Sequence, residues 1–400
     1  MNQYTIKYAA VQAFYWAALC AVLGFAVIGM LEKGYSNSEI GYVMAFSNIV
    51  VVVLQPLIAN AADKNKRLTL KLIIWFFSFL MTAASVVLLF LATASILLTV
   101  MMAVCIISVL AMQPFINSMS VQLEERGIAV NFGVCRSCGS LSYAFISSIV
   151  GILIKTYSYS VVPVTTIFIL IGLFFSVGIL AGSGSSQALC LQNEGDSVKE
   201  QKSRQPQGLV QFLFTNKRFF FFLIGTMLIF YTHMITSNYL IQIVSAVGGD
   251  SSHTGIAASI AAVLELPAMI FFTKLVKRIR CQMLLRVSGI FFMLKYLFLF
   301  LAKSVGMIYF AEVLQIGAYA LFVPASVYYV SRLFGSADMV KGQSMVTTAM
   351  TLGSVFASII GGWMLDACGV HDMQLVAVLL ALLGVIIMSF SMEKISAGVH

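Results

Sequence analysis

The sequence predicts an all-α membrane protein whose twelve transmembrane helices form two pseudo-symmetric six-helix bundles. Composition, the recurrence of apolar runs and a polar stretch near the middle of the chain support this fold class. Of the 400 residues, 60% are hydrophobic and 10% are charged, and the mean hydropathy is +0.98. Soluble domains carry about a quarter charged residues. The composition therefore excludes a water-soluble globular fold.

Apolar runs of about 20 residues recur along the chain, and each is long enough to cross a bilayer as a helix. The first run is too long for a removable signal peptide, and further spans follow it. We therefore expect a multi-pass protein of the inner cell membrane that works as a monomer. The predicted spans are roughly 8–31, 40–62, 69–91, 95–118, 128–153, 160–182, 217–245, 254–276, 282–302, 305–330, 340–365 and 372–392.

The net charge of +9 follows from membrane topology. Basic residues gather at both termini and in the loops on one face, whereas the other face carries Lys33, Lys155 and Lys303. Cytoplasmic loops are enriched in Lys and Arg, so both termini are predicted to be cytoplasmic. This distribution explains the positive charge without a nucleic-acid partner.

A polar, Gly/Ser-rich stretch at 183–212 separates six predicted spans from six more. It lacks apolar periodicity, which is typical of a flexible linker. We expect an N-terminal bundle at 1–182 and a C-terminal bundle at 213–400. Such a layout favours a solute site between two membrane repeats, near the middle of the bilayer.

Four ionisable residues fall deep inside predicted spans: Arg136, Glu265, Lys295 and Glu312. A charged side chain at the bilayer centre costs about 3 kcal/mol on insertion scales, so it usually marks a functional site. For each of the four, a purely structural ion pair that locks the bundle remains the alternative.

Arg136 stands in the stretch "NFGVCRSCGSLSYAF", residues 131–145, and Tyr143 follows two turns later on the same helix face. A guanidinium fork beside an aromatic ring can grip hydroxyl groups and stack on a sugar. The uncharged side chains of Gln12, Trp16 and Asn238 are further candidates for solute contacts.

Glu265 is the candidate proton carrier, because it lies midway along an apolar span beside Pro267, which loosens the helix. Lys295 could tune it. Glu312 could be a second acid or only a partner for Lys295, and His233 ranks third because a histidine can titrate near neutral pH.

The loop between the second and third spans, at 54–71, contains Pro56 followed by Asp63 and a basic cluster. It resembles the signature loop of the major facilitator superfamily. The resemblance implies a conformational gate that braces the closed cytoplasmic face. The residues of this predicted gate are Asp63, Lys64, Lys66 and Arg67.

The arginine stretch and the turn "GYSNSEIGYVMA" at 34–45 resemble the oligosaccharide:proton symporters, the lactose-permease-like branch of that superfamily. The resemblance implies that Arg136 grips the substrate and places Gln315 near a helix-10 histidine of the branch. The helix-4 carboxylate of the permease falls near Asn117, which we expect to contact the solute together with Gln315, and its helix-10 glutamate falls near Ala318. These two departures put galactoside selectivity and the permease's proton route in doubt.

We expect a secondary active transporter that takes up a small polar solute, such as a sugar or oligosaccharide, together with a proton by alternating access. Its partners would be the solute, the proton and the lipid bilayer, and its energy source the proton gradient, without a cofactor. A proton-coupled exporter of drugs or amphipathic compounds, a nucleoside:proton symporter and a non-transporting sensor remain alternatives. An enzyme is disfavoured, since no nucleophile–base pair, metal-ligand cluster or phosphate loop is present.

Overall fold

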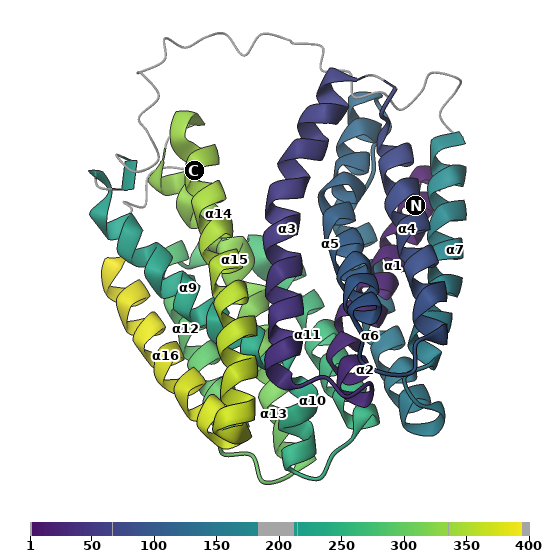
Figure 1. The fold of residues 1–400 in the computed structure, drawn as a ribbon. Helices are drawn as coiled ribbons and strands as arrows, with labels where there is room; N and C mark the ends of the chain where they lie inside the picture. The colour runs from purple at the N-terminus through teal and green to yellow at the C-terminus, as the bar shows by residue number, and fades with distance from the viewer. Residues whose placement is uncertain (1, 66, 183–211, 214, 335, 394–400) are drawn as a thin grey trace.

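The computed structural model describes residues 2–65, 67–182, 212–213, 215–334 and 336–393. Within these ranges all regular structure is helical. The helices form two bundles that stand side by side, α1–α7 in one and α9–α16 in the other (Figure 1). This arrangement agrees with the predicted fold class. The predicted linker lies almost entirely outside the described residues.

The first bundle contains the helices of the N-terminal half. Their bounds are α1 Gln3–Leu23, α2 Ala26–Glu32, α3 Asn37–Lys64, α4 Leu70–Phe90, α5 Ile96–Glu125, α6 Phe132–Tyr157 and α7 Val161–Gly182. The second bundle contains α9 Lys217–Asn238, α10 Leu240–Ala246, α11 Ser251–Arg278, α12 Cys281–Phe300, α13 Val305–Val313, the 3-10 turn η1 Leu314–Ile316, α14 Tyr319–Leu333, α15 Ser336–Ala367 and α16 Gly369–Ser391.

Short polar residues just before the apolar runs start several of these helices. Ser36 caps α3 in a capping box with Glu39, and Asp250 caps α11 by accepting from the backbone of Ser252 and His253. Thr69 starts α4 in the same manner. Such side chains satisfy backbone N–H groups that have no partner inside the helix.

In the described part of the chain, eleven helical segments have the length and hydropathy needed to cross a membrane. They correspond to eleven of the predicted spans. The remaining predicted span is α11, which has 28 residues but is not among these segments. A multi-pass membrane protein is therefore confirmed, and the number twelve stays a prediction.

The loop predicted at 54–71 is shorter in the structure, where α3 ends at Lys64 and α4 begins at Leu70. Helix α3 continues through Pro56 to Lys64, and α11 likewise continues through Pro267. A proline removes one backbone hydrogen bond and kinks a helix, but neighbouring helices can hold the kinked segment in place. Here the side chain of Gln55 donates to the backbone oxygen of Leu110 on α5, 3.1 Å away, and so ties the segment to its neighbour.

Two helix pairs join the bundles: α6 packs on α11, and α3 packs on α15. Glycine residues let the two helix backbones approach closely at both crossings. A Cβ atom on Gly255 would overlap the carbonyl oxygen of Ser147, and a Cβ on Gly41 would overlap that of Ser358. Small residues at such crossings let membrane helices approach backbone to backbone.

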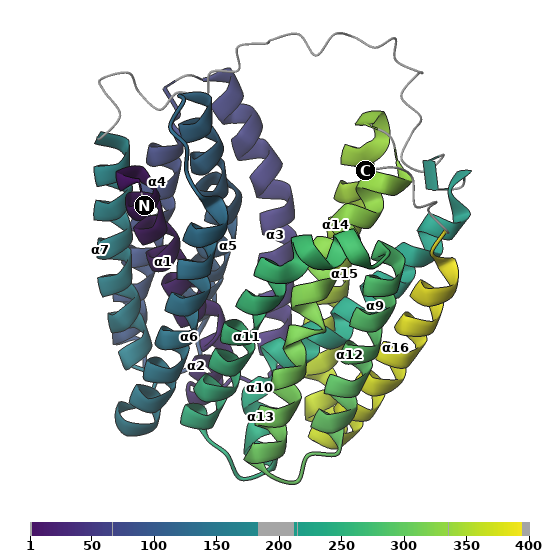
Figure 2. The ribbon, with the colours of Figure 1, turned by 180° about the vertical axis from the view of Figure 1, so that it is seen from behind.

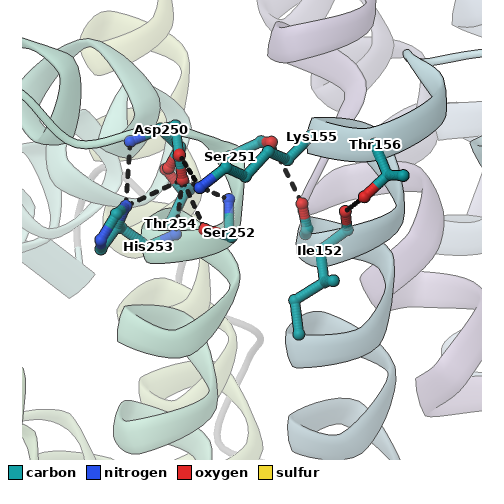
Figure 3. A network of polar contacts seen from close by, with 9 residues as sticks. Ile152, Lys155, Thr156, Asp250, Ser251, Ser252, His253 and Thr254 are labelled. Carbon is teal, nitrogen blue, oxygen red and sulfur yellow. Dashed lines mark hydrogen bonds and ion pairs between the residues drawn. The ribbon is translucent and has the colours of Figure 1, made fainter.

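Polar contacts strengthen the crossing of α6 and α11. The hydroxyl of Ser147 donates to the Gly255 backbone oxygen over 2.9 Å, and Ser251 donates to that of Gly151 over 3.1 Å. Lys155, near the end of α6, forms an ion pair of 2.8 Å with Asp250 at the start of α11 (Figure 3).

The carboxylate of Asp250 in this ion pair stays ionised in mild acid. Burial alone would raise the pKa of Asp250, but hydrogen bonds from Lys155, Ser252 and His253 outweigh burial and hold the pKa below its ordinary value. A carboxyl group with a lowered pKa stabilises the folded state above its ordinary pKa and loses this contribution only as the pH falls through the lowered value. The crossing therefore tolerates mild acid.

The crossing of α3 and α15 is held by Asp366, near the end of α15. Its Oδ1 accepts from the backbone and side-chain nitrogens of Asn37 at 3.1 and 2.8 Å. Its Oδ2 accepts from the backbone nitrogen and hydroxyl of Ser38 at 2.7 and 2.6 Å. Asp366 thus caps the first turn of α3 from the opposite bundle. Gln242 adds a bond of 2.8 Å to Asn37.

These contacts lie at the end of the molecule away from the two termini. Toward the end that carries both termini, the bundles diverge, as the two views show (Figures 1 and 2). In the second half of α3, Val53 and Leu57 are 58% and 60% exposed. The protein is therefore closed at one end and splayed at the other.

Asp366→Asn should weaken the closed end, because an amide cannot accept hydrogen bonds from both Asn37 and Ser38. Allowing for solvent exposure, the loss is about 1 kcal/mol. We expect a roughly five-fold rise in the population with separated ends. Double electron–electron resonance between spin labels at Lys33→Cys and the native Cys368, in a background without the other cysteines, measures this population.

Asp372→Asn is the matched control, because Asp372 is exposed in the first turn of α16, away from the bundle interface. Identical distance distributions for Asp366→Asn and wild type would show that this cap does not hold the bundles together.

Candidate functional site

A chain of polar contacts in the N-terminal bundle joins four residues that the sequence predicted to contact the solute. Gln12, on α1, lies at its centre. Its Nε2 donates to the Tyr8 hydroxyl at 2.7 Å and to Asn117 Oδ1 at 3.3 Å. Its Oε1 accepts from Trp16 Nε1 at 3.1 Å. Because both ends of this amide are held, the Trp16 ring is fixed in position.

Arg136, on α6, lies flat on that ring. The centre of its guanidinium is 3.6 Å from the centroid of Trp16, and its Nη1 donates to the Ser140 hydroxyl at 2.7 Å. Ser140 is one turn further along α6, on the same face. Among the described residues no carboxylate oxygen comes within 4.0 Å of Arg136. The guanidinium is thus held by a ring and a hydroxyl, with donors left over.

The C-terminal bundle contains a second polar chain. Lys295, on α12, forms an ion pair with Glu312 Oε2 over 2.7 Å, and the two side chains are 3% and 4% exposed. Lys295 also donates to Gln315 Oε1 at 2.8 Å. Gln315 Nε2 in turn donates to Glu265 Oε1, on α11, at 3.2 Å. Glu265, Lys295 and Glu312 therefore lie in one hydrogen-bonded series that Gln315 connects.

Gln315 lies in a break of the predicted tenth span. Helix α13 ends at Val313, and α14 begins only at Tyr319 after the 3-10 turn. The backbone oxygen of Ala318, at the break, accepts from the Ser288 hydroxyl at 2.8 Å. A Cβ on Gly317 would overlap the ring of Phe291. The break therefore packs tightly on α12, which carries Lys295 two turns after Ser288.

The two polar chains face each other across the packed helices α6 and α11. Arg136 and Glu265 interact electrostatically across this interface. From the crossing of Gly151 and Gly255, a rise of 1.5 Å per residue places Arg136 roughly 22 Å and Glu265 roughly 15 Å toward the splayed end. The arginine side chain is long enough to cover most of this difference in height.

Two aromatic residues complete this region. Tyr143 packs against a buried cluster that includes Cys20, and it interacts electrostatically with Cys20 and, from the opposite bundle, with Glu265 and Glu312. Tyr319, at the start of α14, interacts with both Arg136 and Glu265. Tyr143 was predicted from the sequence as a solute contact. Tyr319 was missed, although the preceding Gly317 could have indicated a helix interruption there.

Other predicted site residues lie elsewhere or are occupied. His233 stacks on Tyr319 at 4.9 Å and sits among the rings of Phe230 and Phe292, so it is enclosed by aromatic side chains. Asn238 donates to Ser358 on α15 at 3.0 Å, close to the crossing of α3 and α15. Its role as a solute contact stays a prediction that this position does not support.

The predicted gate is only partly described. Lys64 and Arg67 lie at the end of α3 and in the turn after it, and both are exposed. The side chain of Asp63 and all of Lys66 lie outside the described residues. The gate role therefore stays a prediction.

In chemical terms, the site has donors that can bind polar groups and a carboxylate that can exchange a proton. Arg136 offers several N–H donors in one plane, and Glu265 is a carboxylate held by one neutral amide. Within the described ranges, no group of three or more His, Cys, Asp and Glu side chains is placed to hold a metal ion. The site residues thus point to recognition and charge change.

Similar proteins agree with this picture of a transporter. YwbF, an uncharacterized transporter of Bacillus subtilis, is 24% identical over 400 residues, covering 94% of this chain and 91% of YwbF. The maltose permease of Geobacillus stearothermophilus is 23% identical over 362 residues, covering 89% of this chain and 86% of the permease.

Solved structures share the fold. The nucleoside transporter NupG superposes with a TM-score of 0.77 at 15% identity, over 98% of both chains. A bacterial homologue of the iron transporter ferroportin, in an inward-facing state, superposes with a TM-score of 0.70 at 11% identity, over 98% of this chain and all of that one.

A family model described as the MFS_1 like family matches residues 5–395, which is nearly the whole chain. With eleven apolar helical segments, two joined bundles and transporters as relatives, the match identifies a membrane transporter and not an enzyme. The predicted superfamily is thereby confirmed: the chain belongs to the MFS_1-like family of major facilitator transporters.

Proposed function

We propose that the protein is a symporter that takes up a small polar solute, such as a sugar or oligosaccharide, together with a proton. One observation carries this proposal. Arg136 and Glu265 face each other from opposite bundles without forming an ion pair within 4.0 Å, whereas Lys295 and Glu312 neutralise each other in the described structure. One cation and one anion thus remain available at the bundle interface.

The cation is suited to grip hydroxyl groups. The guanidinium of Arg136 is fixed by Trp16 and Ser140, so little conformational entropy is lost when its remaining donors bind a ligand. The amides of Gln12 and Asn117 lie in the same polar chain, behind Trp16. The relative with the printed name maltose permease supports a sugar as the first solute to test.

The anion is suited to carry the proton. When Glu265 is ionised, it attracts Arg136 across the interface. When Glu265 is protonated, this attraction ends, and the guanidinium is released for the solute. Proton loading and solute binding therefore favour the same state, which is the requirement for symport.

The difference between the two ends of the molecule supports transport by alternating access. The crossings at Asp366 and at Lys155 close one end, and the bundles diverge at the other. With both termini in the cytoplasm of a cell with an inner membrane, the described state faces inward. In the opposite state, the loop after α3 would brace the cytoplasmic face through Lys64 and Arg67 together with Asp63 and Lys66. We expect a monomer, because one chain supplies both halves of the site.

A nucleoside is the second candidate solute. Tyr319 presents a ring that is stacked on His233, and Trp16 adds further aromatic surface against Arg136. Such rings can stack on a base as well as on a sugar. The similarity to NupG, whose printed description is a nucleoside transporter, supports this candidate.

Uptake into proteoliposomes distinguishes these solutes. Radiolabelled maltose and radiolabelled nucleosides are offered in parallel, with and without an inwardly directed proton gradient. We expect accumulation of one class only when the gradient is present. Accumulation that is indifferent to the gradient would contradict proton coupling.

Arg136→Lys should weaken solute binding. Lysine keeps the charge but loses the planar fork and the stacking on Trp16. Losing one charge-assisted hydrogen bond costs about 1.5–3 kcal/mol, so we expect binding to be roughly ten- to a hundred-fold weaker. Isothermal titration calorimetry with the solute found in the uptake screen measures this change.

Arg286→Lys is the matched control, since Arg286 is exposed and donates to the Ser389 backbone away from the site. Thermal stability should be unchanged in both variants. Normal binding by Arg136→Lys, or its unfolding, would favour a structural role for this arginine.

Glu265→Gln should uncouple transport from the proton. A permanently neutral side chain keeps the shape and the hydrogen bond with Gln315, but it cannot change charge during the cycle. We expect loss of uphill accumulation, while exchange of labelled for unlabelled solute across the vesicle membrane continues.

Glu125→Gln, in the exposed last turn of α5, is the control and should accumulate solute normally. If Glu265→Gln still accumulates solute against its gradient, the carrier lies elsewhere, and Glu312 and then His233 would be tested next. If Glu265→Gln loses binding itself, Glu265 is a ligand for the solute.

A further inference from the structure

Gln315 connects the buried ion pair to Glu265, and the orientation of its amide group can be deduced. An ammonium group can only donate hydrogen bonds, so Lys295 must face the Oε1 atom of Gln315. The NH2 end then points to Glu265, where Nε2 lies 3.2 Å from the carboxylate Oε1. The opposite orientation would set an NH2 group against an ammonium and an oxygen against a carboxylate, so it is excluded.

The ion pair is fit to hold this orientation permanently. Protonating Glu312 would leave the ammonium of Lys295 buried without a counter-charge, and breaking a buried pair in this way is strongly unfavourable. Lys295 has two acceptors in the described structure, Glu312 Oε2 and Gln315 Oε1. It therefore keeps its bond to the amide in both protonation states of Glu265.

The backbone around Gln315 is equally constrained. Gln315 is 3% exposed and lies in the 3-10 turn between α13 and α14. The Ser288 hydroxyl donates to the carbonyl oxygen of Ala318, which also accepts from the backbone nitrogen of Phe322, and Gly317 abuts the ring of Phe291. Short 3-10 interruptions of membrane helices often lie at functional positions. With both ends of its amide engaged, Gln315 is poorly placed to act as a solute contact.

We propose that Gln315 is a positioning residue, which the ion pair of Lys295 and Glu312 locks so that its NH2 group donates to Glu265 and sets the pH range in which Glu265 exchanges its proton. This inference deepens the proposed function, in which Glu265 carries the coupled proton. In this proposal the ion pair takes part in transport by holding the amide of Gln315, without carrying the coupled proton itself.

Other charged and titratable groups also face Glu265, and they remain in place when Gln315 is changed. The groups are Arg136 and Tyr143 on α6, Lys295 on α12, Glu312 on α13 and Tyr319 on α14. Gln315 differs from them because it is the direct hydrogen-bond donor to the carboxylate. A change of Gln315 therefore isolates the donor from the surrounding charges.

Infrared difference spectroscopy tests the inference without any solute, because the ligand is the proton. The full-length protein in lipid vesicles is titrated with acid while the carbonyl stretch of protonated carboxyl groups is followed, and the band missing in Glu265→Gln is assigned to Glu265. Gln315→Met keeps the length of the side chain but removes the donor. Because the ionised carboxylate then loses its hydrogen bond, the midpoint should move upward by about one pH unit.

Gln374→Met is the matched control. Gln374 is a similarly buried glutamine in the same bundle, and it donates to the Leu299 backbone at 3.2 Å, away from Glu265. Its midpoint should equal that of wild type. Gln315→Leu provides a second uncharged variant if Gln315→Met does not fold: it also lacks the donor to Glu265, so the midpoint should again rise.

An unchanged midpoint in well-folded Gln315→Met or Gln315→Leu would overturn the inference, as would an equal shift in Gln374→Met. The absence of any band assigned to Glu265 would overturn it too. The outcome is separable from the proposed function. If the midpoint shifts as expected but vesicles show no proton-driven uptake, the positioning role stands and symport fails.

Discussion

The cost of a charge in the middle of a bilayer governs this structure. Each ionised group there must find a counter-charge or polar partners, because lipid supplies none. Lys295 and Glu312 meet this demand by pairing directly, with both side chains almost fully buried. Arg136 meets it by lying on Trp16 and binding Ser140, and Glu265 by accepting from Gln315. Only the second solution leaves charges that a ligand or a proton can reach.

The scaffold brings these two groups together by close contact at one end only. The glycines at both crossings let α6 meet α11 and α3 meet α15 backbone to backbone, and Asp366 and Lys155 add bonds between the bundles. These bonds are made to exposed polar groups that water can also satisfy, so the net cost of breaking them is small. A transporter needs this balance, since the same interface has to close and open in every cycle.

The sequence was sufficient for the fold class and for the list of charged residues. A charge inside an apolar run stands out by itself, so Arg136, Glu265, Lys295 and Glu312 were found. The pairing of Lys295 with Glu312 was among the alternatives that the sequence offered. The contact between Glu265 and Gln315 was not, because these residues are far apart in the chain and meet only through packing. Tyr319 gave no charge signal, and the predicted loop at 54–71 was too long, because α3 continues through Pro56 to Lys64. The roles of the site residues in transport remain predictions.

Lys295 and Glu312 form a direct ion pair, whereas Arg136 and Glu265 do not. This difference explains why the site contains so many polar residues. A carboxylate facing Arg136 with no other partner would form a direct ion pair, and such a pair would have to be broken each time the bundles separate. Gln315 gives Glu265 a neutral partner within its own bundle. Ser140 and Trp16 do the same for Arg136 in the other bundle. Each half of the site is thus satisfied on its own, and in the proposed function one proton on Glu265 decides the attraction between the halves.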